Sequence, residues 1–340
     1  MTDHPQNTRE MYEEQERRYH TKQLKRTIRR RGTGIGFAVI GTTLCSLVLS
    51  LMFSALLRKA GMYDYFAAPD FGNLDPTVYY VQYGLLYLSA MVIPFAILAL
   101  CFRLPLREIF YFEERLDRRV PPILLAGFGI AMAANLLVSY LVRALNIFGV
   151  DVDLTPMPFS SEPVDILLYG VILAVLPAFA EEFCYRGVVM GLLRPFGDGF
   201  AVIASASIFG AMHGNAVQIP FAFSVGLVLG FVTVKTGSMW PAMLLHFLNN
   251  GISFVQEVVQ ECANETVSGV FSYGSMLLAA VCGLIGMAWL LKKDPEFFVL
   301  QRRKSLLSEK EKFGWFICNI GMLGCLGYLA VEVVLQLKLL

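Results

Sequence analysis

Long apolar stretches alternate with short polar ones over most of the 340 residues of the chain. Most of these stretches approach the roughly 20 residues that a helix needs to cross a bilayer. The pattern therefore predicts an all-α fold, a polytopic transmembrane helical bundle of about eight to nine segments with a central membrane cavity. The expected segments are 34–57, 81–102, 122–146, 165–193, 200–213, 219–235, 239–257, 270–291 and 313–337.

The segment at 200–213 is the shortest of the nine. At 1.5 Å per residue, a helix of this length spans about 21 Å, less than the roughly 30 Å of a hydrocarbon core. We expect its neighbours to bury it, or the segment to be re-entrant.

Composition supports a membrane protein. Hydrophobic residues make up 56% of the chain and charged residues only 16%, whereas soluble domains are about 25% charged. A net charge of +1 gives no indication of a nucleic-acid partner and leaves membrane lipids as the expected surroundings. The seven cysteines are odd in number and irregularly spaced, so they indicate neither a disulfide framework nor a zinc ribbon.

The polar segments predict how the chain is oriented. Residues 1–33 are polar and end in Arg29, Arg30 and Arg31, which is typical of a cytoplasmic tail whose basic end lies against anionic headgroups; a helix that binds a partner is the alternative. The transmembrane domain then covers 34–340. The loops at 103–121 and 292–312 are basic and the loop at 147–164 is acidic. The positive-inside rule therefore predicts a cytoplasmic N-terminus. We expect a multi-pass integral protein of the cell (plasma) membrane.

Ionisable side chains inside apolar stretches mark a candidate site, because they are costly in a bilayer unless they are paired or line a wet cavity. Glu182 and Arg186 are four residues apart and are predicted to pair on one helix face. Glu181 is turned about 100° from Glu182, so its carboxylate can face a cavity as a general base. Pro177 is expected to open the helix locally. The alternative is a polar helix end at the membrane interface.

The two histidines of the apolar region provide further polar groups. His213 follows Phe209 by one helical turn, among small and polar neighbours. His246 and Asn250 project from one helix face and can both donate to a developing oxyanion. A structural histidine and an interhelical hydrogen-bonding pair are the alternatives. All these groups fall on neighbouring helices, which favours a single functional core at 165–257, with the groups between the mid-membrane and the cytoplasmic half.

These residues form the pattern E-E-x-x-x-R, then F-x-x-x-H, then H-x-x-x-N, which resembles that of the CPBP intramembrane proteases. This family comprises type II CAAX prenyl endopeptidases and bacteriocin-processing relatives, and it is also called the Abi family. The resemblance covers about a quarter of the chain, and all three motifs are complete and in order. It implies an intramembrane endopeptidase that hydrolyses a peptide bond near the membrane face, in a peptide or protein substrate that is lipidated for CAAX-type members.

The resemblance also implies roles for the site residues. Glu181 would activate a water molecule that His213 helps to hold. His246 and Asn250 would stabilise the tetrahedral oxyanion. The supporting residues would be Glu182, Arg186 and Phe209, with the arginine locked by its neighbouring glutamate.

A metal site is a further possibility that the resemblance raises, because the family is often called metalloprotease. Glu181, His213 and His246 are ligand types that Zn²⁺ accepts. The chain has no H-E-x-x-H motif, and a metal-free mechanism based on glutamate fits the same residues. We favour the metal-free mechanism and leave the Zn²⁺ alternative open.

Two other functions are compatible with polar residues in a membrane bundle. A proton- or ion-coupled transporter would use the glutamate and histidines as a relay, but it is expected to show an internal repeat, and no convincing repeat is visible. A non-catalytic scaffold, or an immunity or maturation factor on the same fold, is expected to have degenerate motifs, and the motifs here are intact. The sequence leaves the oligomeric state open.

Overall fold

The computed structural model describes residues 4–61, 71, 74–111, 118–148, 150–152, 157–300 and 304–339. Eight of the nine predicted segments coincide closely with one helix or with the central span, and the ninth, at 313–337, covers two helices, so the prediction of an all-α polytopic bundle is confirmed. The helices outside the central span are α1 (His4–Lys59), α2 (Pro76–Cys101), α3 (Leu106–Ile109), α4 (Val120–Ile147), α8 (Asp198–Ala211), α9 (Gln218–Thr236), α10 (Trp240–Cys262), α11 (Glu265–Lys293), α12 (Glu309–Ile317) and α13 (Ile320–Gln336).

The central span is one continuous helical rod from Pro163 to Phe196 whose winding changes along its length. Its parts are α5 (Pro163–Gly170), the π-helix η2 (Val171–Val175), α6 (Leu176–Glu182), the π-helix η3 (Phe183–Val189), α7 (Met190–Leu193) and the 3₁₀ turn η4 (Arg194–Phe196). Single π-helical turns interrupt helices most often at functional sites. Here they flank the segment that carries the two adjacent glutamates.

Fewer helices are apolar and long enough to cross a membrane than the sequence predicted. Within the described residues six helices qualify, and a seventh span results if the bent pair α12 and α13 is counted as one. Helix α8 is too short, as expected. Helix α10 is long enough but too polar, because one of its faces carries His246, Asn249 and Asn250.

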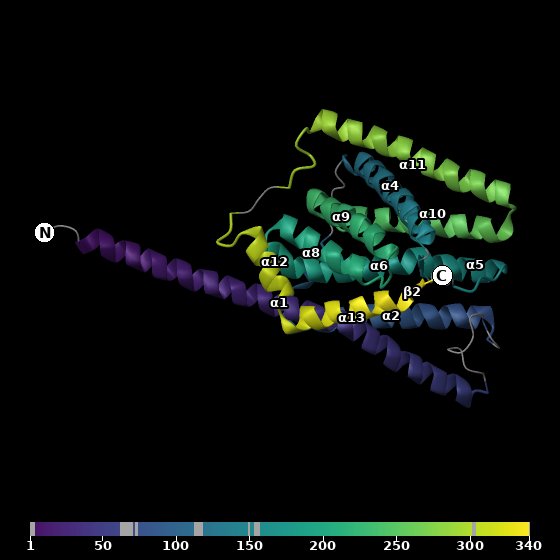
Figure 1. The fold of residues 1–340 in the computed structure, drawn as a ribbon, viewed down its shortest axis with the longest axis horizontal. Coiled ribbons are helices and arrows are strands. Elements are labelled where there is room, and N and C mark those ends of the chain that lie inside the picture. Colours follow the sequence, from purple (N-terminus) through teal and green to yellow (C-terminus); the bar gives the residue numbers. More distant parts are fainter. Residues whose placement is uncertain are drawn as a thin grey trace.

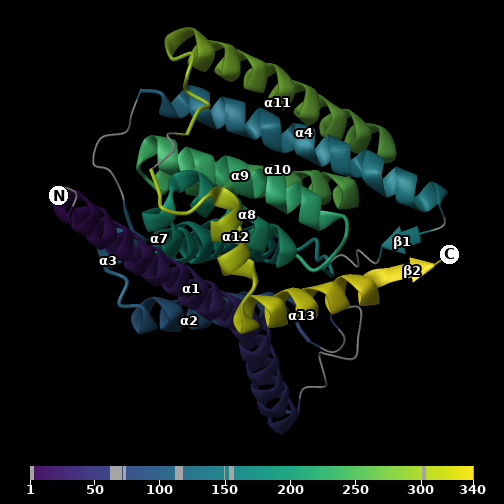
Figure 2. The same ribbon diagram turned by 60° about the vertical axis from the view of Figure 1, so that its left-hand side comes forward.

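The helices are arranged in layers, which Figure 2 shows from the side. Helices α11 and α4 lie against each other on one face, α9 and α10 lie beneath them, and the central span and α8 follow. Helices α1, α2 and α13 close the opposite face. The first half of α1 projects away from the bundle as a single exposed helix (Figure 1). Two three-residue strands, β1 (Val150–Val152) and β2 (Leu337–Leu339), pair antiparallel near the C-terminus.

The predicted segment at 313–337 is not one continuous helix, and this expectation was wrong. Helices α12 and α13 meet at an angle of 75°. Asn319 lies in the break, where its Oδ1 accepts from the backbone N–H of Met322 and its amide donates to the carbonyl of Phe316. Asparagine is a preferred N-cap, so it starts a new helix inside an otherwise apolar run. The hydroxyl of Thr33 on α1 also donates to Asn319 and so ties the bend to the first helix.

Candidate functional site

The polar residues from the three motifs meet in one pocket of about 360 Å³. Its walls come from α2, the central span, α9 and α10, and from the end of α8. The predicted residues that line it are Glu181, Phe209, His213, His246 and Asn250. The structure therefore brings together side chains that are up to 69 residues apart in the sequence (250 − 181).

Glu181 is the carboxylate that faces the pocket. Only 12% of its side chain is exposed. The hydroxyl of Tyr87 on α2 donates to its Oε1 atom at 2.6 Å, and Nε2 of His246 lies 3.6 Å from its Oε2 atom. Glu181, which the sequence predicted to be free of Arg186, is thus held between Tyr87 and His246 and faces the pocket.

Glu182 is fully buried and has two partners. Its Oε1 atom accepts from Nη1 of Arg186 at 2.9 Å, which confirms the predicted pair, and from Nδ1 of His246 at 2.8 Å. A carboxylate can only accept, so Nδ1 of His246 carries a proton. Glu182 therefore sets the orientation of the histidine ring and turns its Nε2 atom toward Glu181 and the pocket.

Arg186 joins the central span to the helices that surround it. Its Nη2 atom donates to the carbonyl of Gly226 on α9 at 3.1 Å, and its guanidinium lies 4.8 Å from the ring centroid of Phe209 on α8. The hydroxyl of Tyr111, at the edge of the bundle, donates to the Arg186 carbonyl at 3.4 Å; burial raises the pKa of Tyr111 to about 12, which keeps this donor protonated. Arg186 is thus a buried structural cation and lines no part of the pocket.

Phe209 and His213 belong to the end of α8. The Phe209 ring packs edge-on against the rings of His213 and His246, with centroids 5.1 and 5.9 Å away. Nδ1 of His213 lies 2.9 Å from the carbonyl of Phe209. A carbonyl can only accept, so Nδ1–H donates, and in the neutral ring Nε2 is left as an acceptor toward the pocket.

Pro177 explains why Asn250 is placed where it is. Proline has no N–H and cannot donate to the carbonyl four residues earlier, which is that of Leu173. The side-chain amide of Asn250 donates to this carbonyl at 3.1 Å, while its Oδ1 atom accepts from Asn249. One N–H of the Asn250 amide is therefore used to repair the helix, and its second N–H remains to act as a donor in the pocket.

Two of these contacts could not be predicted from the sequence. Tyr87 is one of fourteen tyrosines and lies 94 residues before Glu181, on a helix without any motif residue. The second role of Glu182, as the partner of His246, depends on how the central span packs against α10. The bond from Asn250 to Leu173 had one signal in the sequence, the proline inside an apolar helix.

The site residues do not fit a metal centre. Within the described part of the chain, no group of three or more His, Cys, Asp or Glu side chains is arranged to hold a metal ion. This arrangement of the described side chains does not support the metalloprotease interpretation of Glu181, His213 and His246, and no step below involves a metal.

Residues 163–252 match the family model described as type II CAAX prenyl endopeptidase Rce1-like. This segment is an Rce1-like domain. The resemblance to CPBP proteases is thereby confirmed. The Rce1-like domain begins with α5 and ends in α10 just beyond Asn250, so it contains the motif residues and leaves out Tyr87. No curated protein and no solved structure matches the chain.

Proposed function

We propose that this chain is an intramembrane endopeptidase that hydrolyses a peptide bond near the membrane face, by a mechanism based on Glu181. The observation that carries the proposal is the pocket itself. A poorly exposed carboxylate and an imidazole lie 3.6 Å apart, and the pocket they line has room for a peptide carbonyl and a water molecule. The match of residues 163–252 to the Rce1-like family model supports the same reaction class.

Glu181 acts as the general base in this mechanism. It takes a proton from a water molecule while the oxygen of that water attacks the peptide carbonyl carbon. The unprotonated Nε2 of His213 accepts a hydrogen bond from the second hydrogen of the water. When the C–N bond breaks, Glu181 returns the proton to the leaving amine nitrogen, so that water and peptide yield a carboxylic acid and an amine.

His246 and Asn250 stabilise the oxyanion that forms on the carbonyl oxygen. Nδ1–H of His246 is held by Glu182, so its Nε2 atom donates to the oxyanion when the ring carries its second proton. The remaining amide N–H of Asn250 is the other donor. Removing one such donor typically lowers kcat by a factor of about 10²–10³.

The substrate class is proposed to be a peptide or protein tail at the membrane, with a lipidated C-a-a-X tail as one candidate. The test is proteolysis by the full chain in liposomes, with a peptide library that includes farnesylated C-a-a-X peptides. We expect cleavage by wild type and by Glu261→Gln, an exposed carboxylate at the end of α10. Cleavage should be lost in Glu181→Gln and His246→Ala, and a chelator should leave the wild-type rate unchanged.

Four other outcomes of these experiments would contradict this mechanism and favour a different one. Undiminished cleavage by Glu181→Gln would exclude glutamate catalysis, and loss of cleavage with chelator would establish a metal. If no peptide is cut but the same partner protein co-purifies with wild type and both variants, a non-catalytic scaffold is the better explanation. Proton uptake coupled to solute flux in the same liposomes would point to a transporter.

A further inference from the structure

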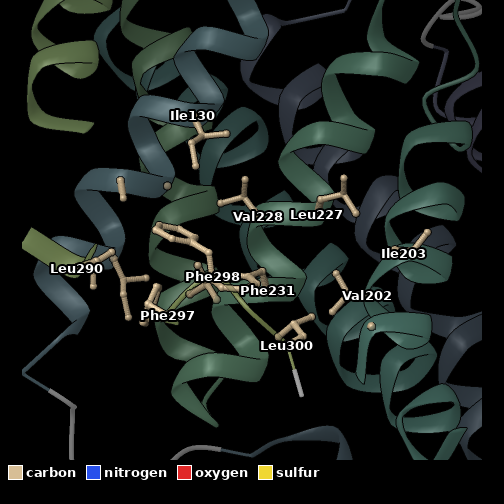
Figure 3. Close-up of a pocket in the computed structure, with 15 residues that line it drawn as sticks. Ile130, Val202, Ile203, Leu227, Val228, Phe231, Leu290, Phe297, Phe298 and Leu300 are labelled. Carbon is tan, nitrogen blue, oxygen red and sulfur yellow. The ribbon is translucent and has the colours of Figure 1, made fainter. Parts of the chain in front are cut away.

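A second cavity, of about 430 Å³, lies at the other end of α9 from the candidate site. Its walls come from α4, α8, α9, the end of α11 and the segment at 297–300 that follows α11. Figure 3 shows Ile130, Val228 and Phe231 on its walls, with Phe297 and Leu300 closing one side. All fifteen lining residues are apolar. The volume is in the range of roughly 300–1,000 Å³ that is usual for small-molecule sites.

The cavity lies near one end of the bundle. It is lined by the first turns of α4 and α8 and by the last turns of α9 and α11. Charged residues lie beside two of these helix ends, at Arg118 and Arg119 before α4 and at Lys293 and Asp294 at the end of α11. A molecule in the cavity would therefore have its apolar part between the helices and its other end at the depth of the lipid headgroups.

Cations surround this end of the cavity. Nζ of Lys235 lies 5.6 and 5.3 Å from the ring centroids of Phe231 and Phe297, which both line the cavity. It donates to the carbonyl of Val299 at 2.7 Å, and an ammonium group has two further N–H donors. Exposed Lys293 comes three residues after the lining residue Leu290 and therefore projects from the same side of α11.

The acidic groups at this rim are fewer. Asp294 lies 3.8 Å from Arg119, the residue before α4, and is balanced by it. Glu296 is exposed on the segment that closes the cavity. Lys235 and Lys293 therefore exceed the remaining acidic charge of Glu296 at this rim, and an anion is the complementary ligand.

We propose that the cavity binds one acyl chain of an anionic phospholipid, with the lipid phosphate held by Lys235 and Lys293. The apolar walls exclude polar ligands, because no side-chain donor or acceptor lines them. A zwitterionic or neutral lipid would fill the cavity but leave the excess of lysine charge uncompensated. A basic residue near a membrane surface contributes about a fivefold preference for anionic lipid. The lysines at the rim therefore select the headgroup, and the cavity holds the acyl chain.

The test is competition for the delipidated full chain in detergent between phosphatidylglycerol and phosphatidylcholine with identical acyl chains, with bound lipid counted by native mass spectrometry. We expect one tightly held phosphatidylglycerol per chain. Val228→Trp and Ile130→Trp fill the cavity from opposite walls, and each should lower its occupancy about as far as the nonspecific level. Leu284→Trp adds the same side chain to an exposed face of α11 and should retain the lipid.

The headgroup part is tested by Lys235→Gln combined with Lys293→Gln. This pair should lower the preference for phosphatidylglycerol over phosphatidylcholine by about 25-fold, fivefold for each lysine, without lowering the total occupancy. Equal lipid retention by wild type and both cavity-filling variants would overturn the proposal, provided that the variants elute as folded protein. Displacement of the lipid by a farnesylated peptide would overturn it too, because the cavity would then hold the substrate's own lipid.

Discussion

Tyr87 reaches Glu181 from α2, outside the Rce1-like domain, and its hydroxyl donates to the carboxylate that is proposed to accept the water proton. Hydrogen bonds to charged groups contribute about 1.5–3 kcal/mol. We expect Tyr87→Phe to lower kcat about tenfold or more with little change in KM, because the carboxylate loses its orientation and not its charge. Cleavage kinetics in liposomes measure this. Tyr83→Phe, in the same pocket wall, is the matched control and should cleave like wild type.

The buried group of Glu182, Arg186 and His246 allows stability to be separated from activity. Glu182→Gln leaves the Arg186 charge buried without its counter-charge, which typically costs about 3–5 kcal/mol. We expect a clearly lower Tm in detergent. The double variant Glu182→Leu and Arg186→Met should recover most of this Tm but remain inactive, because His246 has lost the acceptor that orients it. A double variant that cleaves at the wild-type rate would contradict the role given to Glu182.

At the scale of single residues, the sequence predicted much of the candidate site. The spacing of four residues was enough to place Glu182 against Arg186 and to turn Glu181 away, because helix geometry fixes both relations. It was not enough to find Tyr87 or the contact between Glu182 and His246. Those contacts depend on how separate helices pack, and a tyrosine in an apolar helix is more often a core residue than a site residue.

At the scale of helices, Pro177 shapes the central span. It frees the Leu173 carbonyl that Asn250 binds, and it lies between the two π-helical turns. Pro177→Ala supplies a backbone N–H that competes with Asn250 for this carbonyl. We therefore expect a Tm equal to or above that of wild type together with a cleavage rate several-fold lower. A variant with unchanged kinetics would show that the proline is a packing feature alone.

Helices α8 and α9 approach each other closely at Gly226. This contact positions the Phe209 ring beside the candidate site. A Cβ atom at Gly226 would lie 3.0 Å from Cδ1 of Phe209 and 3.1 Å from Cα of Ala206. Gly226→Ala is expected to cost about 1–3 kcal/mol through overpacking and to lower activity by displacing Phe209. Gly274→Ala, where a Cβ atom would meet nothing within 4 Å, should be neutral or stabilising. Thermal unfolding of both variants in detergent makes the comparison.

The helix boundaries illustrate what apolar patterns can and cannot predict. The short α8 was recognised from its length alone. The bend between α12 and α13 was missed because hydropathy treats Asn319 as one polar residue in an apolar run, whereas as an N-cap it begins a helix in a new direction. Helix α10 was predicted to be an ordinary membrane span, but the polar residues on the face toward the site make it too polar for one. Polar residues of this kind are typical of a helix that lines a water-filled cavity.

For the whole molecule, the basic end of the bundle and the pocket of the candidate site lie toward opposite ends of α9. Lys235 near the end of α9 and Arg119 before α4 belong to the basic end of the bundle, whereas Met157 and Gln218, which line the pocket, lie toward the other end of α9. If the basic end is cytoplasmic, as the positive-inside rule predicts, the pocket extends toward the outer face. This differs from the cytoplasmic half that the sequence alone suggested for the motif residues, because the sequence does not show which way a pocket extends.

Two native cysteines test this orientation without any substitution. Cys101 ends α2 beside the basic loop, Cys262 ends α10 between Glu261 and Glu265, and both are exposed. A membrane-impermeant maleimide applied to intact cells that express the full chain should label Cys262 and leave Cys101 unmodified, as read from peptide masses. Permeabilised cells, in which both should react, are the control. The reverse pattern would place the basic end outside and the mouth of the pocket in the cytoplasm, so that the substrate tail would be cytoplasmic.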